Sequence, residues 1–194
     1  MHKLLFFASG SGTNFQSVID AIESGTLHAE IIGLITDRKN AGAIQRAEKY
    51  SIPIFIISPS EPKTFRNKLL SLLADLSPDL IVLAGYLRKI PDEIIDQFRN
   101  KIINIHPSLL PKYGGKGFYG LNVHRAVIDN SEPISGCTVH FVNEVYDSGA
   151  IINQSTTAVT ENDTPESLAK KVLRLEHKLL PDTIKKLLTK KKTD

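Results

Sequence analysis

Residues 4–15, Leu-Leu-Phe-Phe-Ala-Ser-Gly-Ser-Gly-Thr-Asn-Phe, decide the fold class. The first five form a continuous apolar run that predicts a buried strand, and the glycines that follow predict a tight turn. Apolar residues then recur at helical spacing over Phe15–Glu23. The segment therefore predicts a strand, a turn and a helix in immediate succession.

The same alternation continues through the first half of the chain. Three more apolar runs predict strands and two periodic segments predict helices: the strands are Ile31–Thr36, Ile54–Ile57 and Leu80–Ala84, and the helices are Ala41–Tyr50 and Thr64–Leu76. Strands that are apolar along their whole length have both faces covered, as in parallel sheets between helices. The predicted fold class is α/β, a doubly wound, mostly parallel sheet flanked by helices, with ligands beyond the carboxyl ends of the strands.

The second half of the chain is less regular. The predicted elements are strands at Ile102–Ile105, Thr138–Val142 and Ala150–Ser155, and helices at Leu121–Asp129 and Pro165–Leu188. We expect an interruption of the last helix at Pro181, because the residue before a proline avoids the helical region. No repeat or linker divides the sequence, so we expect one domain over residues 1–194, with a basic tail at about 189–194.

The composition is that of an ordinary globular protein, with 194 residues, 41% hydrophobic and 23% charged, and a formal net charge of +3. No apolar run approaches the roughly 20 residues that span a bilayer, so no membrane contact is expected. The lysines near the C-terminus have no interleaved aromatic residues, which disfavours nucleic-acid binding. The single cysteine, Cys137, cannot form an internal disulfide, which fits a cytoplasmic location.

The glycine turn Gly10–Asn14 is the first candidate site. Its glycines let the backbone approach an anion, and the N–H groups at the start of a helix favour phosphate. A dinucleotide fingerprint with Asp37 as the ribose acid is the obvious reading, but Phe15 stands where the third glycine would be. We therefore expect a single phosphate. The alternative is a purely structural turn capped by Thr13 or Asn14.

Asn104 and His106 form the second candidate site. They are two residues apart on a predicted strand, so their side chains share one face. An amide donor beside an imidazole at the carboxyl end of a strand can stabilise a developing oxyanion. A histidine held only by local backbone is the structural alternative. Asp147, in a turn between the last two strands, would raise the pKa of His106 and orient its ring if the fold brought the two together.

The other histidines carry weaker signals. His140 lies on an apolar strand, where a core or inter-strand role is expected, and His124 is expected to face solvent or anchor a loop. Cys137 is expected to be a small buried residue. No group of Cys, His or acidic residues has the spacing of a metal site, so no metal is expected.

Together these residues resemble the glycinamide ribonucleotide formyltransferase family of purine synthesis, over about residues 3–185. The resemblance lies in five stretches: GSGTN near the start, LAGYLRKI at 83–90, NIHPSLLPKYGG at 104–115, GCTVHFV at 136–142 and YDSGAII at 146–152. It implies a Rossmann-like formyltransferase fold and transfer of a formyl group from 10-formyltetrahydrofolate to the amine of glycinamide ribonucleotide.

The resemblance also implies a role for each site residue. Asn104, His106 and Asp147 would be catalytic; Ser11, Gly12, Thr13, Asn14 and Glu176 would bind the ribonucleotide; Lys63, Leu87, Arg88, Lys89, Ile90 and Asn104 would bind the folate. Protonated His106 and the Asn104 amide would stabilise the oxyanion, with Asp147 supporting the imidazolium. The partners would be these small molecules alone, and the protein a monomer or homodimer.

Three other functions remain open at this point. Formyltetrahydrofolate hydrolase shares the three catalytic residues but usually carries an extra amino-terminal domain, whereas this match begins at about residue 3. Methionyl-tRNA formyltransferase needs a carboxyl-terminal RNA-binding domain, and only about 40 residues follow the last predicted strand. A non-catalytic phosphosugar-binding module would treat the three residues as coincidental and would show no dependence on folate.

Overall fold

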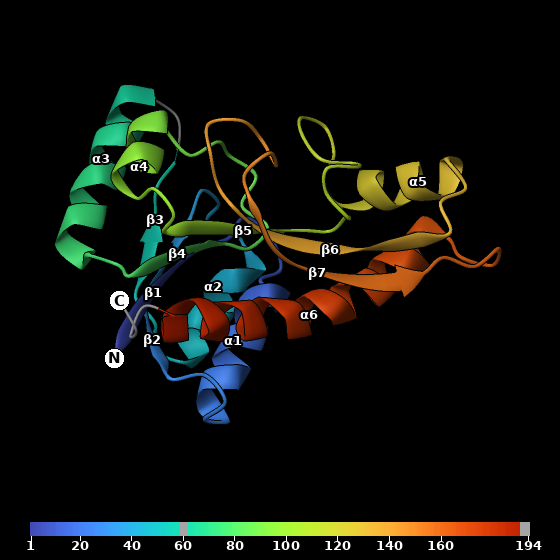
Figure 1. The fold of residues 1–194 in the computed structure, drawn as a ribbon. Helices are drawn as coiled ribbons and strands as arrows, with labels where there is room; N and C mark the ends of the chain where they lie inside the picture. Colours follow the sequence, from blue (N-terminus) through green and yellow to red (C-terminus); the bar gives the residue numbers. More distant parts are fainter. Residues whose placement is uncertain (59–61, 191–194) are drawn as a thin grey trace. The chain divides into compact units, whose positions relative to one another are not determined.

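The computed structural model describes residues 1–58 and 62–190, so residues 191–194 of the predicted basic tail lie outside the described residues. The strands of its seven-stranded sheet follow the order β3-β2-β1-β4-β5-β6-β7 (Figure 1). They are β1 (His2–Phe7), β2 (Ala29–Thr36), β3 (Ile54–Ile56), β4 (Leu80–Leu83), β5 (Ile102–His106), β6 (Ile134–Phe141) and β7 (Ile151–Ala158). The helices are α1 (Thr13–Glu23), α2 (Gly42–Lys49), α3 (Pro62–Leu76), α4 (Asp92–Gln97), α5 (Leu121–Asp129) and α6 (Pro165–Lys190). The predicted fold class is confirmed.

The chain forms two compact units, Met1–Ile103 and Asn104–Asp194, which are described separately. The expectation of one domain stays a prediction. In the first unit β1 pairs in parallel with β2 and with β4, and β2 pairs in parallel with β3. Parallel strands end at the same edge, so the segments after β1 and β4 meet there, where the N–H of Ser9 donates to the carbonyl of Gly85 at 3.1 Å.

The helices of the first unit bury apolar side chains of different sizes. α1 buries Phe15 and Val18, and α2 buries Ala43 and Ala47. The ring of Phe15 packs on that of Phe6 in β1, with ring centroids 5.0 Å apart. Phe15 therefore fills the space that a dinucleotide-binding turn keeps open with glycine.

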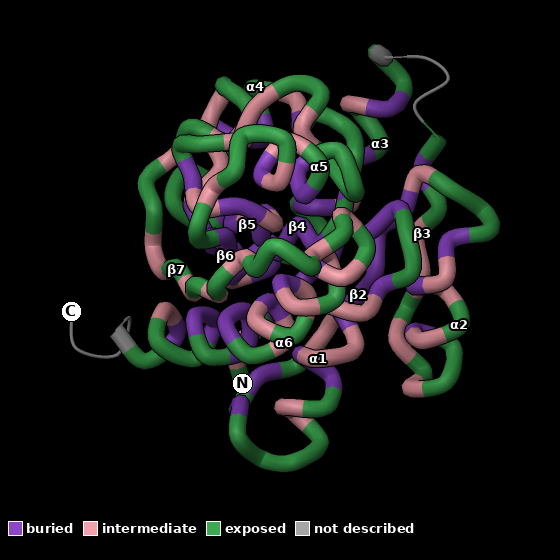
Figure 2. Tube along the Cα trace, turned by 90° about the vertical axis from the view of Figure 1, so that its right-hand side faces the viewer, coloured by how far each residue is buried: buried purple, intermediate pink, exposed green. Residues whose placement is uncertain are grey.

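The second unit is built on an antiparallel pair, β6 with β7. α6 packs against both strands and against α5. Its buried positions recur every three or four residues, as the banding of the α6 tube in Figure 2 shows, and they include Leu168, Val172, Leu180 and Ile184. An amphipathic stripe of this kind is what holds a long helix on a sheet.

Two features differ from the expectations for the helices. The prediction of an interruption at Pro181 is wrong, because α6 continues unbroken through this proline. Leu179, Leu180 and Ile184 around the proline are buried, and this burial outweighs one missing backbone hydrogen bond. α4 was not predicted, since six residues are too few to show a period. None of the helices in the described ranges is long and apolar enough to cross a membrane.

The start of α6 is fixed by a cluster of side-chain hydrogen bonds. Thr164 and Ser167 form a reciprocal capping box, in which each backbone N–H donates to the other's hydroxyl, at 3.0 and 3.2 Å. The carboxylate of Asp163, almost fully buried, accepts from Ser167, from Thr160 and from the Lys171 ammonium at 2.6 Å. The ion pair with Lys171 and these hydrogen bonds lower the pKa of Asp163.

Asp163→Asn tests this cluster. A carboxylate with a lowered pKa stabilises the fold above its unfolded-state pKa, near 3.8, and loses that contribution as pH falls through its folded-state pKa. We expect the variant to lose about 1–2 kcal/mol of unfolding free energy at pH 7, and the difference from wild type to shrink below about pH 4. Urea unfolding at several pH values measures this, with the exposed Asp75→Asn as control. A difference that stays constant down to pH 2 would contradict the assignment.

Candidate functional site

The glycine turn of the first unit ends at the start of α1. Gly12 is the N-cap residue with φ +72°, and the first intrahelical bond runs from the N–H of Gln16 to the Gly12 carbonyl at 2.9 Å. The preceding N–H groups of the first turn therefore have no intrahelical acceptor. The N-cap glycine has no side chain that could cap this end, and no acidic residue lies in the first turn. The end of the helix is suited to an anion.

α2 holds this turn in place. The N–H of Ala43 donates to the carbonyl of Gly10 at 3.1 Å, and Nε of Arg46 donates to the carbonyl of Ser11 at 2.9 Å. Both carbonyl oxygens are thereby directed to α2. The approach is so close that a Cβ on Gly12 would lie 2.7 Å from the Ala43 Cα.

The segment predicted to bind folate, residues 87–90, follows β4 in the same unit. Leu87, Arg88 and Lys89 are exposed, whereas Ile90 is buried. Arg88 forms an ion pair with Asp37 at 3.1 Å, and Lys89 forms one with Asp92 at 2.8 Å.

Two further predicted residues can be located within their own units. Lys63 is exposed in the first turn of α3. Glu176 is buried on α6, where its charge and above all burial raise the pKa of the Cys137 thiol to about 12. The thiol is therefore not a reactive nucleophile, as expected for a small buried residue.

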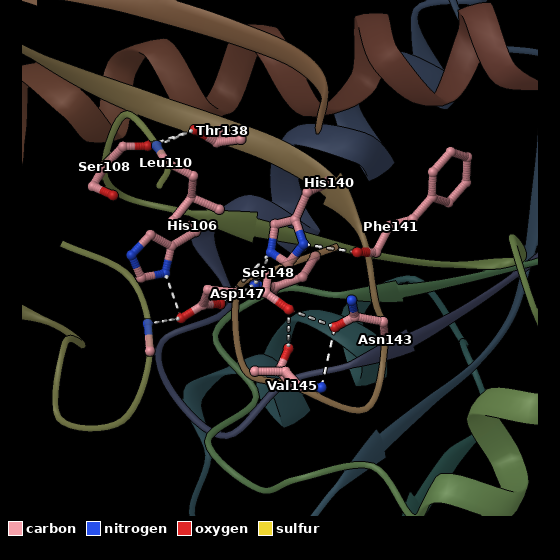
Figure 3. Close-up of polar contacts among 12 residues, drawn as sticks. His106, Ser108, Leu110, Thr138, His140, Phe141, Asn143, Val145, Asp147 and Ser148 are labelled. Atoms are coloured by element: carbon pink, nitrogen blue, oxygen red, sulfur yellow. Dashed lines mark hydrogen bonds and ion pairs between the residues drawn. The ribbon is translucent and has the colours of Figure 1, made fainter. Parts of the chain in front are cut away.

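In the second unit, Asn104, His106 and Asp147 lie together (Figure 3 shows His106 and Asp147). His106 Nδ1 is 3.5 Å from Asp147 Oδ2, and Asn104 Nδ2 is 3.4 Å from Asp147 Oδ1. The structure thus brings the strand pair and an aspartate 41 or more residues away into one cluster. Their catalytic roles stay predictions.

The hydrogen bonds of His106 define its tautomer. Its Nε2 lies 2.8 Å from the carbonyl oxygen of Tyr113, which can only accept, so Nε2 carries a hydrogen. Nδ1, at 3.5 Å from the carboxylate, is then the basic nitrogen. Burial lowers the pKa of His106, and the charge of Asp147 offsets this only in part. Asp147 thus raises the pKa of His106, as expected, but desolvation is the larger effect and the pKa is lowered overall.

His140 completes the cluster, and its contact with Asn104 on β5 is the inter-strand role that was one of two expected for it. Its Nδ1 donates to the carbonyl of Phe141 at 2.8 Å, which leaves Nε2 to accept from Asn104 Nδ2 at 3.1 Å. The same Nε2 is 3.6 Å from Asp147 Oδ1. His140 thus orients the Asn104 amide. The sequence could have indicated this role, because His140 lies on the strand that leads directly into the turn with Asp147.

The turn that carries Asp147 is held by its own hydrogen bonds. Asp147 has φ +54°, a conformation that costs a non-glycine residue on the order of 1 kcal/mol. Asn143 accepts from the N–H of Val145 and the hydroxyl of Ser148, which closes the turn (Figure 3). At Gly149 a Cβ would lie 1.8 Å from the carbonyl of Phe141, so only glycine fits.

The glycine-rich segment 113–120 closes against the same cluster. The N–H of Gly115 donates to Asp147 Oδ2 at 2.9 Å. Glu132 anchors the segment by accepting from Lys112 and from the Tyr113 hydroxyl. Burial would raise the pKa of Asp147, but its contacts with His140, His106 and the Gly115 N–H lower it, so the carboxylate is ionised.

The strand exit after His106 is fixed by Thr138 on β6. Its hydroxyl donates to the Ser108 carbonyl at 2.6 Å and accepts from the Leu110 N–H at 3.1 Å (Figure 3). Of the two expectations for His124, that it faces solvent is wrong, because the residue is buried. Its Nδ1 lacks a hydrogen-bond partner in the described part of the chain, and burial lowers its pKa to about 4. The described residues contain no cluster of three His, Cys or acidic side chains that could hold a metal ion.

Comparisons with known proteins give matches along nearly the whole chain. Residues 2–184 match the family described as Formyl transferase. The phosphoribosylglycinamide formyltransferase of Bacillus subtilis is 38% identical over 194 residues, covering 97% of this chain and 95% of that protein. A chloroplastic phosphoribosylglycinamide formyltransferase of Arabidopsis thaliana is 41% identical over 94% of this chain, which spans only 64% of that protein's length. The crystal structure of glycinamide ribonucleotide transformylase 1 from Geobacillus kaustophilus superposes with a TM-score of 0.89, at 36% identity and with 97% of this chain and 99% of that chain covered.

Gly12→Ala tests the contact between the turn and α2, and Gly25→Ala is its matched control. Both glycines have nearly the same positive φ, but only at Gly12 does an added Cβ meet a neighbour. We expect each substitution to cost about 1–2 kcal/mol for the backbone conformation, and Gly12→Ala about 1–3 kcal/mol more for the clash. Urea unfolding measures the difference. Equal losses of unfolding free energy in the two variants would contradict the predicted clash, because α2 would then move away from the added Cβ at no cost.

Asp147→Asn tests the electrostatic coupling in the second unit. Because the Asp147 charge supports the imidazolium, its removal should lower the pKa of His106 further below the ordinary value of 6.5. Titration of the histidine ring signals by NMR measures this, with the exposed His28 as internal reference. A pKa of His106 that rises or stays unchanged in the variant would contradict the coupling.

Proposed function

The chain belongs to the formyl transferase family, and on that premise we propose that it transfers the formyl group of 10-formyltetrahydrofolate to the amine of glycinamide ribonucleotide. The products are formylglycinamide ribonucleotide and tetrahydrofolate. The observation that carries the proposal is the cluster of Asn104, His106 and Asp147, in which a basic imidazole nitrogen and an amide donor lie at one ionised carboxylate. The names of the B. subtilis and A. thaliana relatives support this choice of acceptor.

The first step is attack of the amine on the formyl carbon. The nitrogen lone pair forms the new C–N bond, and the carbonyl π pair moves onto the oxygen. Asn104 has one N–H fixed on His140 at 3.1 Å, whereas its second faces Asp147 at 3.4 Å, a longer and weaker contact. That second N–H is the group free to turn to the oxyanion.

The second step moves a proton and breaks the old bond. The attacking nitrogen, now cationic, gives a proton to His106 Nδ1, and Asp147 stabilises the imidazolium from 3.5 Å. Collapse of the tetrahedral intermediate breaks the bond between the formyl carbon and folate N10. N10 takes the proton from His106, which returns to its neutral form.

The remaining assignments concern binding. In the first unit, the backbone of Ser11, Gly12, Thr13 and Asn14 would hold the phosphate, because these residues lead into the start of α1, where helix N–H groups and the helix dipole favour an anion. The main chain of Leu87–Ile90 would hold the folate, and Lys63 would contact it as well. In the second unit, Glu176 would contact the ribose and Asn104 the folate formyl group. A cytoplasmic monomer or homodimer acting on small molecules is part of the same proposal.

An absorbance assay of folate release, with and without glycinamide ribonucleotide, tests the proposal. Release that requires the ribonucleotide is expected. Release without it would indicate a hydrolase, and no release from folded protein would indicate a binding module.

Alanine variants test the assigned roles. We expect Asn104→Ala and His106→Ala to lower kcat about 10²–10⁴-fold while changing the KM values much less, because both groups act on the transition state. Asn67→Ala and His28→Ala, exposed residues of the same types, serve as controls. Near-normal turnover in both site variants would remove the assignment.

A further inference from the structure

We propose that Asp37 is a positioning residue that fixes the 85–90 segment in the form that binds the folate co-substrate. The proposal rests on the proposed function for the identity of the ligand. Asp37 follows β2 in the first unit, where the sequence offered it as a ribose-binding acid, a role that fails with the dinucleotide fingerprint. Its carboxylate is nevertheless buried and ionised, so the fold maintains it for another purpose.

The contacts of Asp37 are with protein groups. Its side chain is only 1% exposed. Oδ1 accepts from the hydroxyl of Ser9 at 2.6 Å, and Oδ2 accepts from Nε of Arg88 at 3.1 Å. Burial would raise the pKa of Asp37, but the hydrogen bonds from Ser9 and Arg88 outweigh it and the pKa is lowered. The carboxylate thus faces the segment after β4 instead of a nucleotide.

Ser9 extends the contact to the main chain. Its hydroxyl, which donates to Asp37, accepts from the N–H of Leu87 at 3.3 Å. Its own N–H donates to the carbonyl of Gly85 at 3.1 Å. Asp37 therefore holds the segment twice, through the Arg88 guanidinium and through Ser9 to the backbone on either side of Tyr86.

The segment needs such an anchor because it has little regular structure. Residues 84–91 form neither helix nor strand, and Leu87, Arg88 and Lys89 are exposed. Recognition through main-chain groups requires those groups to be held before the ligand arrives, since ordering them on binding would weaken affinity. The buried ring of Tyr86, packed edge-on against Phe7 at 5.2 Å, secures the middle but leaves the amide of Leu87 to Ser9.

An asparagine at position 37 would keep the shape of the side chain but would lose the ion pair with Arg88. Its oxygen could still accept from Ser9, but its amide group would place N–H donors against the Arg88 guanidinium, which has no acceptor. Asp37→Asn should therefore release Arg88 and loosen Leu87 with little change in the core. Ser9→Ala, a milder change, removes only the link to the backbone.

The experiment measures both ligands and the segment itself. Tetrahydrofolate and glycinamide ribonucleotide are titrated by calorimetry into wild type, Asp37→Asn and Ser9→Ala, steady-state kinetics are recorded, and amide hydrogen exchange is followed in peptides over residues 85–90. Asp96→Asn is the matched control, because it also removes a carboxylate from an arginine, Arg99, but on the surface of α4. We expect faster exchange over 85–90 in Asp37→Asn and Ser9→Ala. The KM and Kd for folate should rise about 10–100-fold in Asp37→Asn, as for loss of a charge-assisted hydrogen bond, while the kcat and the ribonucleotide Kd change less than twofold.

Three outcomes would overturn the proposal. Faster exchange with unchanged folate affinity would show that the segment does not need this anchor. Equal weakening of both ligands would indicate a general structural role, and unchanged exchange in both variants would show that Asp37 does not hold the segment. Failure of the proposed function has a separate signature, since wild type itself would then bind no tetrahydrofolate.

Discussion

The arrangement of the candidate site in the second unit depends on the buried, ionised carboxylate of Asp147. A carboxylate taken out of water costs several kcal/mol unless hydrogen-bond donors and positive charge replace its hydration. The chain supplies donors from two segments, the Asn104 amide on β5 and the N–H of Gly115 in the glycine-rich segment, while His106 Nδ1 and His140 Nε2 lie 3.5 and 3.6 Å from the carboxylate. Each of these segments is thereby fixed by one charge, and the strained φ of Asp147 is held by the same contacts.

The first unit also contains a buried carboxylate, Asp37, whose hydrogen bonds hold a loop in place. This carboxylate accepts hydrogen bonds from Ser9 and Arg88, which connect the segment after β4 to the turn after β1. α2 meanwhile contacts this turn as well, since Ala43 and Arg46 donate to the carbonyl oxygens of Gly10 and Ser11. The contacts of Asp37 depend on parallel strands ending at one edge, because this arrangement brings the segments after β1, β2 and β4 within hydrogen-bond reach of one another.

The sequence predicted the elements better than their contacts. Continuous apolar runs identified the strands, but α4 was too short for a period, and Pro181 was overruled by burial of its neighbours. Asn104 and His106 could be paired from their spacing on one strand, whereas Asp147 needed the resemblance to a family. The contacts of the Tyr113 carbonyl and the Gly115 N–H could not be predicted from the sequence, because every residue type carries these backbone groups.

The lowered pKa of His106 gives the proposed chemistry its direction. A cationic imidazole would already be held by Asp147 and would have no nitrogen free to accept a proton. Burial instead keeps the ring neutral, with Nε2–H committed to Tyr113 and Nδ1 left basic at 3.5 Å from the carboxylate. Once the proton arrives, the distance to Asp147 becomes an attraction between opposite charges. In the proposed mechanism the imidazole would become charged only after the amine has attacked, so Asp147 would stabilise the intermediate and not the resting enzyme.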